Sequence, residues 1–310
     1  MDKCAEKQAL IKVFGSYAEK AEESESPDFV IRNNSYSHGI EITEFYPTDI
    51  DAKLQNAPSY TVGLLDETQQ LHRKDRGILR VENVTVTHQD GTSVGDVRAI
   101  IQRNPTPVEK FDLLIKTIRN KSSKCKSYLE RCNVVDLVIW DRSPLFGSES
   151  ETQQLSANFA ENRGFLALAP FRELFILSRS FDPPNHFYYP VRGNLFLVDA
   201  LLLDHAYLES GGETSDGQRL PLLVHCLNEL GHKACYQAPP NESIHVPGWQ
   251  LLLDGLNLTL RNWTNHGEVQ PLPETNSQPY PVERETVVNI VSKRFAMHCT
   301  NIVAMSAYET

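Results

Sequence analysis

The chain has 310 residues, of which 40% are hydrophobic and 23% are charged, so it is long enough for one large or two ordinary globular domains. Its net charge of -10 argues against a protein that coats nucleic acid through its overall field, so any nucleic-acid binding requires a local basic surface. The amino-terminal sequence lacks an apolar signal segment, and no apolar run is long enough to span a bilayer, which predicts a soluble, cytoplasmic protein.

The first predicted element is a helix over residues 2–22. Apolar side chains recur there at three- and four-residue steps, which places them on one face of a helix. These residues are Leu10, Ile11, Phe14, Tyr17, Ala18 and Ala21. The end of this segment is rich in carboxylates, which is typical of a helix end exposed to solvent.

Residues 27–46 predict a β-hairpin that carries two carboxylates. Residues 29–31 form a short apolar run, residues 33–35 with Gly39 have turn chemistry, and residues 40–46 alternate as a strand does. Asp28 opens the first strand and Glu41 lies near the start of the second. Strand pairing can therefore bring the two carboxylates close enough to share a divalent metal ion.

The Pro27-Asp28 pair, followed by Glu41-Ile42-Thr43, resembles the motif of the PD-(D/E)xK nuclease superfamily. The resemblance implies a restriction-endonuclease-like α/β fold, a mixed sheet flanked by helices, over residues 1–182. It also implies that Asp28 and Glu41 hold Mg²⁺ or Mn²⁺ beside a scissile phosphate of DNA or RNA. Thr43 stands where the family usually carries a lysine, and there it would hydrogen-bond the attacking water.

In such folds an acidic residue from the first helix can join the metal site. The candidates here are Glu19, Glu22 and Glu23. A different interpretation of the hairpin assigns Asp28 to a turn cap and Glu41 to a solvated strand position, with no metal chemistry.

The next stretch predicts further helix and strand. Residues 47–77 are mixed and polar, so we expect loosely packed helix interrupted at Pro58. Residues 78–87 alternate and are followed by Asp90-Gly91, which is a hairpin signal. We expect these strands to extend the sheet that contains the first hairpin.

Residues 108–132 predict an amphipathic helix with a basic surface. Lys121 and Lys126 flank its apolar stripe, so their stems can lie along the sheet. Lys121 or Lys124 could replace the lysine that is absent at Thr43. Substrate phosphates would be contacted by Lys116, Arg119 and Lys126. A lysine-rich surface helix without such a role explains the same pattern.

Two buried strands are predicted further along. Residues 134–140 are almost entirely apolar and β-branched, and residues 171–178 repeat this pattern after a helix-like stretch at 151–162. Helix, hairpin, helix, strand, helix and strand together predict an α/β domain over residues 1–182.

Residues 183–310 predict a second, smaller α/β region. An apolar run at 195–203, a glycine loop at 211–217, a helix at 220–230 and a short strand at 233–238 look like a Rossmann-like opening. This order resembles the start of nucleotide-sugar glycosyltransferases. The proline-rich residues 264–285 are expected to form an irregular linker before the last segment.

Three functions follow from these patterns. The first is a Mg²⁺-dependent nuclease that hydrolyses phosphodiester bonds of DNA or RNA. The second is a nucleic-acid-binding protein on a nuclease-like fold that does not cleave. The third is a glycosyltransferase fragment formed by residues 183–310.

Overall fold

The computed structural model describes residues 2–33, 36–46, 49–73, 75–76, 79–102, 105–142, 148–164, 169–179, 186–212, 216–237, 242–254, 257–263, 282–297 and 307–308. The chain forms two compact units, one from Met1–Glu44 with Lys116–Thr310 and one from Phe45–Ile115. The boundary predicted after residue 182 does not coincide with this division. Strands β7 (Leu174–Arg179) and β8 (His186–Pro190) pair antiparallel across it, which joins the two sides into one unit.

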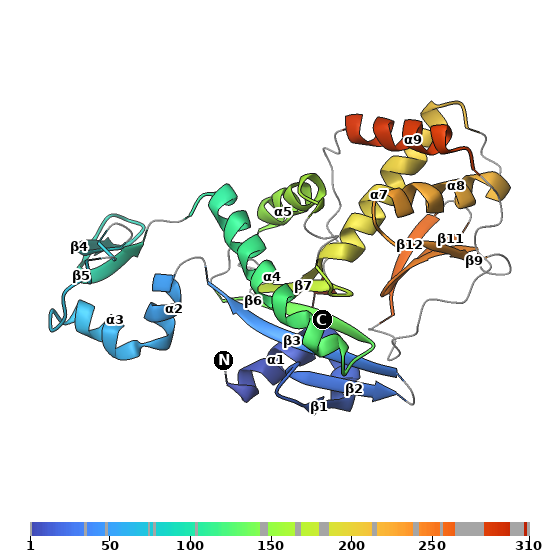
Figure 1. Cartoon of the computed structure of the whole chain (residues 1–310). Helices are drawn as coiled ribbons and strands as arrows, with labels where there is room; N and C mark the ends of the chain where they lie inside the picture. Colours follow the sequence, from blue (N-terminus) through green and yellow to red (C-terminus); the bar gives the residue numbers. More distant parts are fainter. Residues whose placement is uncertain are drawn as a thin grey trace. The chain divides into compact units, whose positions relative to one another are not determined.

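The first unit contains a mixed sheet in the order β1-β2-β3-β6-β7-β8-β13. Figure 1 labels β1, β2, β3, β6 and β7 of this sheet. Its amino-terminal strands are β1 (Ala21–Glu23), β2 (Phe29–Asn33) and β3 (Tyr36–Phe45), and they pair antiparallel. β6 (Val134–Asp141) and β7 run parallel, and β13 (Ala307–Tyr308) pairs with β8. The predicted α/β class with a mixed sheet is therefore confirmed.

The first helix is shorter than predicted. α1 (Lys3–Phe14) is capped by Asp2, whose side chain accepts a hydrogen bond from the Ala5 N–H at 2.8 Å. It ends at Gly15, whose φ of 52° suits glycine and interrupts the helix. The 3₁₀ helix η1 (Gly15–Lys20) follows and carries the apolar side chains of Tyr17 and Ala18 into the same core. The apolar periodicity thus continues beyond the end of the α-helix.

Strand alternation separates the two faces of the sheet. Ile40 and Ile42 of β3 belong to the core that α1 covers. Glu41 lies between them and therefore points to the opposite face. Helix α4 (Pro107–Leu129) approaches this opposite face, where its Lys121 pairs with Glu41.

Gly39 lies within β3, opposite Val30, and not in the turn where its sequence context suggested it. A Cβ at this position would come within 2.7 Å of Cγ of Pro27 and 3.0 Å of Sγ of Cys132. Glycine is needed here because the segment that leads into Asp28 packs directly on the backbone of β3.

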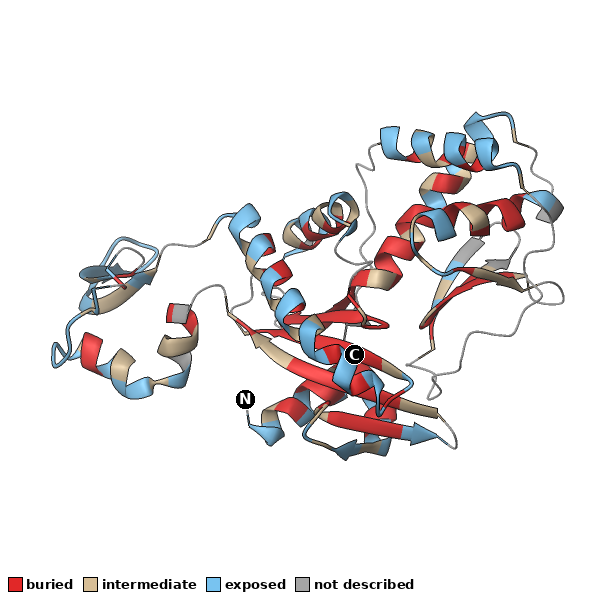
Figure 2. Ribbon diagram, in the orientation of Figure 1, coloured by how far each residue is buried: buried red, intermediate tan, exposed pale blue. Residues whose placement is uncertain are grey.

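The buried centre of the sheet contains a charged network. β6 and β7 are buried along almost their whole length (Figure 2). Asp136 of β6 accepts hydrogen bonds from Nε of Arg172 at 2.8 Å and lies 2.9 Å from Nε2 of His38. Burial opposes ionisation, but Arg172 and His38 hold the pKa of Asp136 below its usual value. The Asp136 carboxylate therefore links β3, β6 and the segment that precedes β7.

Replacing Asp136 with Asn is expected to lower the free energy of unfolding by about 3 kcal/mol, because the buried Arg172 loses its counter-charge. Urea denaturation measures the change. Glu130→Gln, at an exposed position after α4, serves as the charge-matched control and should change stability by less than about 0.5 kcal/mol. Equal stability of the two variants would contradict a structural role for the network.

The second unit contains α2 (Asp49–Asn56), α3 (Pro58–Leu65), β4 (Leu79–Thr87) and β5 (Ser93–Gln102). β4 and β5 form a separate two-stranded sheet, so the prediction that they extend the first sheet is wrong. Most of their residues are exposed, and such a ribbon has no face that requires burial in the larger sheet. Pro58 starts α3, where its missing N–H costs nothing.

The carboxyl-terminal part of the first unit packs α7 (Val191–Glu209), α8 (Asp216–Glu229) and α9 (Arg284–Ala296) with the sheet β12-β11-β10-β9. These strands are β9 (Cys235–Gln237), β10 (Ser243–Val246), β11 (Trp249–Asp254) and β12 (Asn257–Asn262), all antiparallel. The apolar run at 195–203 lies inside α7, so the predicted Rossmann-like opening is wrong. A short apolar run does not by itself distinguish a buried strand from a buried helix.

The predicted linker at 264–285 lies outside the described residues up to position 281. Within the described ranges, the helices include none that is both long and apolar enough to cross a membrane.

Candidate functional site

Asp28 and Glu41 meet at one end of the β2–β3 hairpin. The register pairs Phe29 with Ile40, and one further antiparallel step sets Asp28 opposite Glu41. Oδ2 of Asp28 accepts a hydrogen bond from the Ile42 N–H at 2.8 Å, which fixes this carboxylate beside β3. The hairpin therefore brings together the two carboxylates that the sequence indicated.

The carboxyl group of Asp28 has an unusual acidity. Burial raises its pKa to about 6; the Ile42 N–H and Lys3 oppose this shift, while the charges of Glu41 and Glu6 add to it. A carboxylate that is partly desolvated among other acids is destabilised in its charged form. A bound cation would relieve this cost.

Lys121 reaches Glu41 from α4. Its Nζ donates a hydrogen bond to Oε1 of Glu41 at 2.7 Å. The Glu41 side chain is 7% exposed and that of Lys121 is 23% exposed, so the ion pair is open to solvent on the lysine side. The structure thus places an ammonium group at the acidic pair, although position 43 carries no lysine.

The other residues proposed from sequence lie on β3 and α4. Thr43 is on the same face of β3 as Glu41, two residues along, and its hydroxyl lies 3.5 Å from the backbone oxygen of Glu44. Lys124 is exposed on α4. Exposed positions on the same helix are also occupied by Lys116, Arg119 and Lys126. Of the two candidate lysines, Lys121 is the one that contacts Glu41.

The acid that the first helix contributes near Asp28 is Glu6. It is buried and pairs with Nζ of Lys3 at 2.8 Å, and Lys3 also lies 3.6 Å from Oδ1 of Asp28. The predicted acids Glu19, Glu22 and Glu23 lie in η1 and β1, where all three are exposed. The sequence signal for Glu6 is its position in the first turn of α1.

Tyr128 is a further residue that sequence reasoning missed. It lies on the buried face of α4, seven residues after Lys121, and so on the same side of the helix. Burial, the charge of Glu41 and a hydrogen bond to that carboxylate raise the pKa of the Tyr128 phenol. A neutral phenol and an ammonium group therefore both face Glu41.

Asp28→Asn is expected to stabilise the metal-free protein above pH 6. In the folded protein the pKa of Asp28 is raised, so the stability that its protonated form provides is present below pH 4 and is lost as the pH rises through about 6. Asn avoids that loss and can still accept the Ile42 N–H. The expected gain at pH 8 is about 1–2 kcal/mol, because the carboxylate is partly exposed.

Urea unfolding at pH 8 and at pH 4 measures this difference, which should vanish at the lower pH. Asp112→Asn, at an exposed position on α4, is the control and should show no such pH dependence. A destabilised Asp28→Asn variant at pH 8 would show that Asp28 is a structural residue.

The carboxylate oxygens of Asp28 and Glu41 provide part of the ligand shell that a hard cation such as Mg²⁺ needs. Mg²⁺ is commonly bound by one or two carboxylates, with water and substrate phosphate completing the shell. Asp28 and Glu41 match that requirement. Within the described ranges, no group of three or more His, Cys, Asp or Glu residues is arranged to hold a metal ion.

Comparison with protein-family models, curated proteins and solved structures found no match for this chain. The function of the protein is therefore inferred from the chemistry of the site.

Proposed function

We propose that the protein is a metal-dependent nuclease whose site contains Asp28, Glu41 and Lys121. The observation that carries the proposal is the 2.7 Å contact between Nζ of Lys121 and Glu41, which supplies the cation that is missing from position 43. The chain order of α1, three antiparallel strands, α4 and β6 also agrees with the proposed restriction-endonuclease-like arrangement.

Asp28 and Glu41 would hold a Mg²⁺ or Mn²⁺ ion. The raised pKa of Asp28 supports this assignment, because a desolvated acidic pair gains from a divalent cation. When bound, the ion would neutralise charge on the phosphate and make water a better nucleophile.

The protein residues would orient the reactants. Lys121 would move from its ion pair with Glu41 towards the phosphate, where its ammonium group stabilises negative charge that develops during hydrolysis. The hydroxyl of Tyr128 would remain hydrogen-bonded to the Glu41 carboxylate. This contact would keep the carboxylate in place when Lys121 moves. Thr43 lies on the same face of β3 as Glu41, two residues along, and would hydrogen-bond the attacking water.

Nucleic acid would approach along α4. Four basic side chains are exposed on this helix in a protein whose net charge is -10, so they form a local positive surface. They are Lys116, Arg119, Lys124 and Lys126. Contacts of this kind bind phosphates irrespective of base sequence.

Incubation with single- and double-stranded DNA and RNA in Mg²⁺ or Mn²⁺ tests the proposal. We expect cleavage of at least one of these substrates and none in EDTA. Absence of cleavage in every combination would contradict the nuclease assignment.

A second candidate is a protein that binds nucleic acid without cutting it. The closed ion pair between Lys121 and Glu41 favours this alternative, since it satisfies Glu41 without any metal ion. Gel-shift binding in EDTA, combined with no cleavage in either metal, is the result expected for it. The glycosyltransferase alternative lacks support, because its expected first strand is part of α7.

A further inference from the structure

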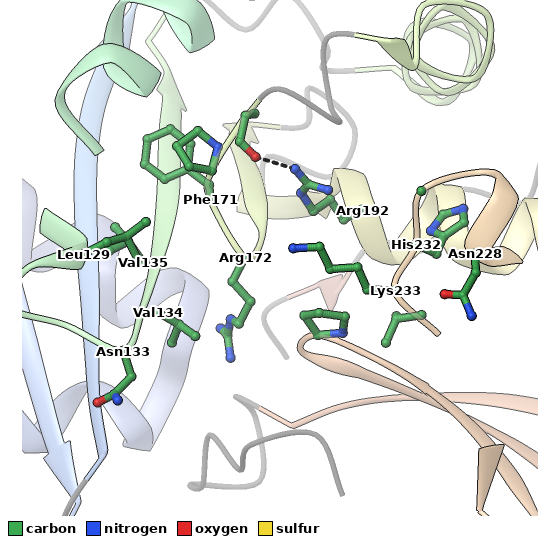
Figure 3. A pocket seen from close by; sticks show the side chains of 15 residues that line it. Leu129, Asn133, Val134, Val135, Phe171, Arg172, Arg192, Asn228, His232 and Lys233 are labelled. Atoms are coloured by element: carbon green, nitrogen blue, oxygen red, sulfur yellow. Dashed lines mark hydrogen bonds between the residues drawn. The ribbon is translucent and has the colours of Figure 1, made fainter. Parts of the chain in front are cut away.

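A pocket of about 510 Å³ lies in the first unit, and neither Asp28 nor Glu41 lines it (Figure 3). It is lined by the end of α4, the start of β6, the segment before β7, the start of α7 and the turns that follow α8 and β10. Its volume is within the range of small-molecule sites. None of the described residues that line it is acidic.

Three basic side chains converge on this pocket from different elements. Figure 3 shows Arg172, Arg192 and Lys233 around it. Arg172 is buried, and its Nη1 has no hydrogen-bond partner among the described residues. Such a buried donor is costly unless a ligand or water accepts from it.

The acids near the pocket are hydrogen-bonded to the residues that line it or to their neighbours, and the pairing with Asp136 leaves Nη1 as the nitrogen of Arg172 without a partner among the described residues. Asp136 pairs with Arg172 and His38, and Glu173 accepts the backbone N–H groups of Arg192 at 2.7 Å and Gly193 at 3.0 Å. The guanidinium of Arg192 also donates to the backbone oxygen of Ala169 at 2.7 Å.

His232, another lining residue, pairs with the buried Asp199 at 2.6 Å. That aspartate also binds the guanidinium groups of Arg163 and Arg294. None of the acids in these two networks lines the pocket, so the charged side chains that do line it are basic.

Lys233 is held at the pocket in a conformation that suits glycine. Its φ is 54°, in the left-handed region that a lysine rarely adopts. The turn is fixed by Asn228, whose side chain accepts the Ala234 N–H at 2.6 Å and donates to the Ala234 oxygen at 3.0 Å. This turn places the exposed Lys233 side chain at the pocket, where its ammonium group can reach a ligand.

We propose that this pocket binds the phosphate monoester of a nucleotide. Such a group carries a charge of about -1.5 to -2 at pH 7, which suits several cations better than a single carboxylate does. The pocket is much larger than a free phosphate ion. Phe171, Pro170 and the apolar residues of β6 supply a wall for the base and sugar.

Isothermal titration calorimetry of the metal-free 310-residue chain with nucleoside 5′-monophosphates tests the site. We expect these to bind, and unphosphorylated nucleosides and inorganic phosphate to bind at least about tenfold more weakly. No binding of the monophosphates, or equal affinity for inorganic phosphate, would overturn the proposal.

Lys233→Met and Lys233→Gly should each weaken binding about tenfold or more. Glycine also relieves the left-handed conformation, so the Lys233→Gly variant should melt at an equal or higher temperature while it binds less. Lys20→Met, at an exposed position in η1, is the control and should bind normally. Unchanged affinity in both Lys233 variants would overturn the proposal.

A 5′-phosphorylated trinucleotide distinguishes the two sources of the same group. Tighter binding than a mononucleotide supports a strand end as the ligand, and weaker binding supports a free nucleotide. The site does not depend on the nuclease proposal, so Asp28→Asn should leave the calorimetric affinity unchanged whether or not the protein cleaves nucleic acid.

Discussion

Asp28→Asn and Glu41→Gln are each expected to abolish Mg²⁺-dependent cleavage of nucleic acid, with a loss of at least about 10³-fold. Each substitution removes one negative charge and keeps the shape of the side chain. Cation binding should fail because each variant leaves only one carboxylate of the Asp28–Glu41 pair. The measurement is the initial cleavage rate on the substrate that the parent protein cuts best, over a range of Mg²⁺ concentrations.

The control for this prediction is Glu130→Gln, which removes an exposed carboxylate and should cleave at the parental rate. Circular dichroism should show that all three variants are folded. Of the two site variants, Asp28→Asn should have the higher free energy of unfolding at pH 8. Full activity in either the Asp28 or the Glu41 variant would refute the assignment of the metal site.

Lys121→Met is expected to lower the cleavage rate by about 10²–10³-fold, because it removes the ammonium group that would stabilise charge on the phosphate. Methionine preserves most of the apolar stem that packs between α4 and the sheet. Stability should fall by only about 1 kcal/mol, since the lysine side of the ion pair is partly exposed. Cleavage kinetics and thermal unfolding are measured on the same preparations.

Lys124→Met provides a matched comparison on the same helix. Lys124 is exposed, so its loss should weaken substrate binding slightly and leave the rate at saturating substrate unchanged. If the Lys121 and Lys124 variants cut equally well, Lys121 does not replace the lysine that is missing from position 43. The binding protein without cleavage would then be the better interpretation.

The hairpin at 27–46 was predictable because its information is local. Alternating apolar residues specify the strands, and the register then follows from the short connection between them. The sequence alone could therefore place Asp28 and Glu41 on neighbouring strands, although the turn that it indicated at Gly39 lies inside β3. The buried strand β6 and the basic helix α4 were predictable for the same reason, since period and composition mark both.

The sequence was less informative where several structures satisfy the same pattern. The run at 195–203 is apolar enough for a strand or for a buried helix, and packing against α8 and α9 selects the helix. The β4–β5 ribbon has the alternation of a sheet strand, yet nothing in that pattern specifies which sheet it joins.

The sequence by itself determined the α/β class, the acidic hairpin and a helix that offers lysines. Tertiary structure alone decided that Lys121 rather than Lys124 meets Glu41, that Glu6 lies near Asp28, and that Tyr128 faces the same carboxylate. The physical reason is that side-chain direction within one element follows from local periodicity. Contact between residues 80 positions apart depends instead on how a whole helix packs across the sheet, which no local pattern encodes.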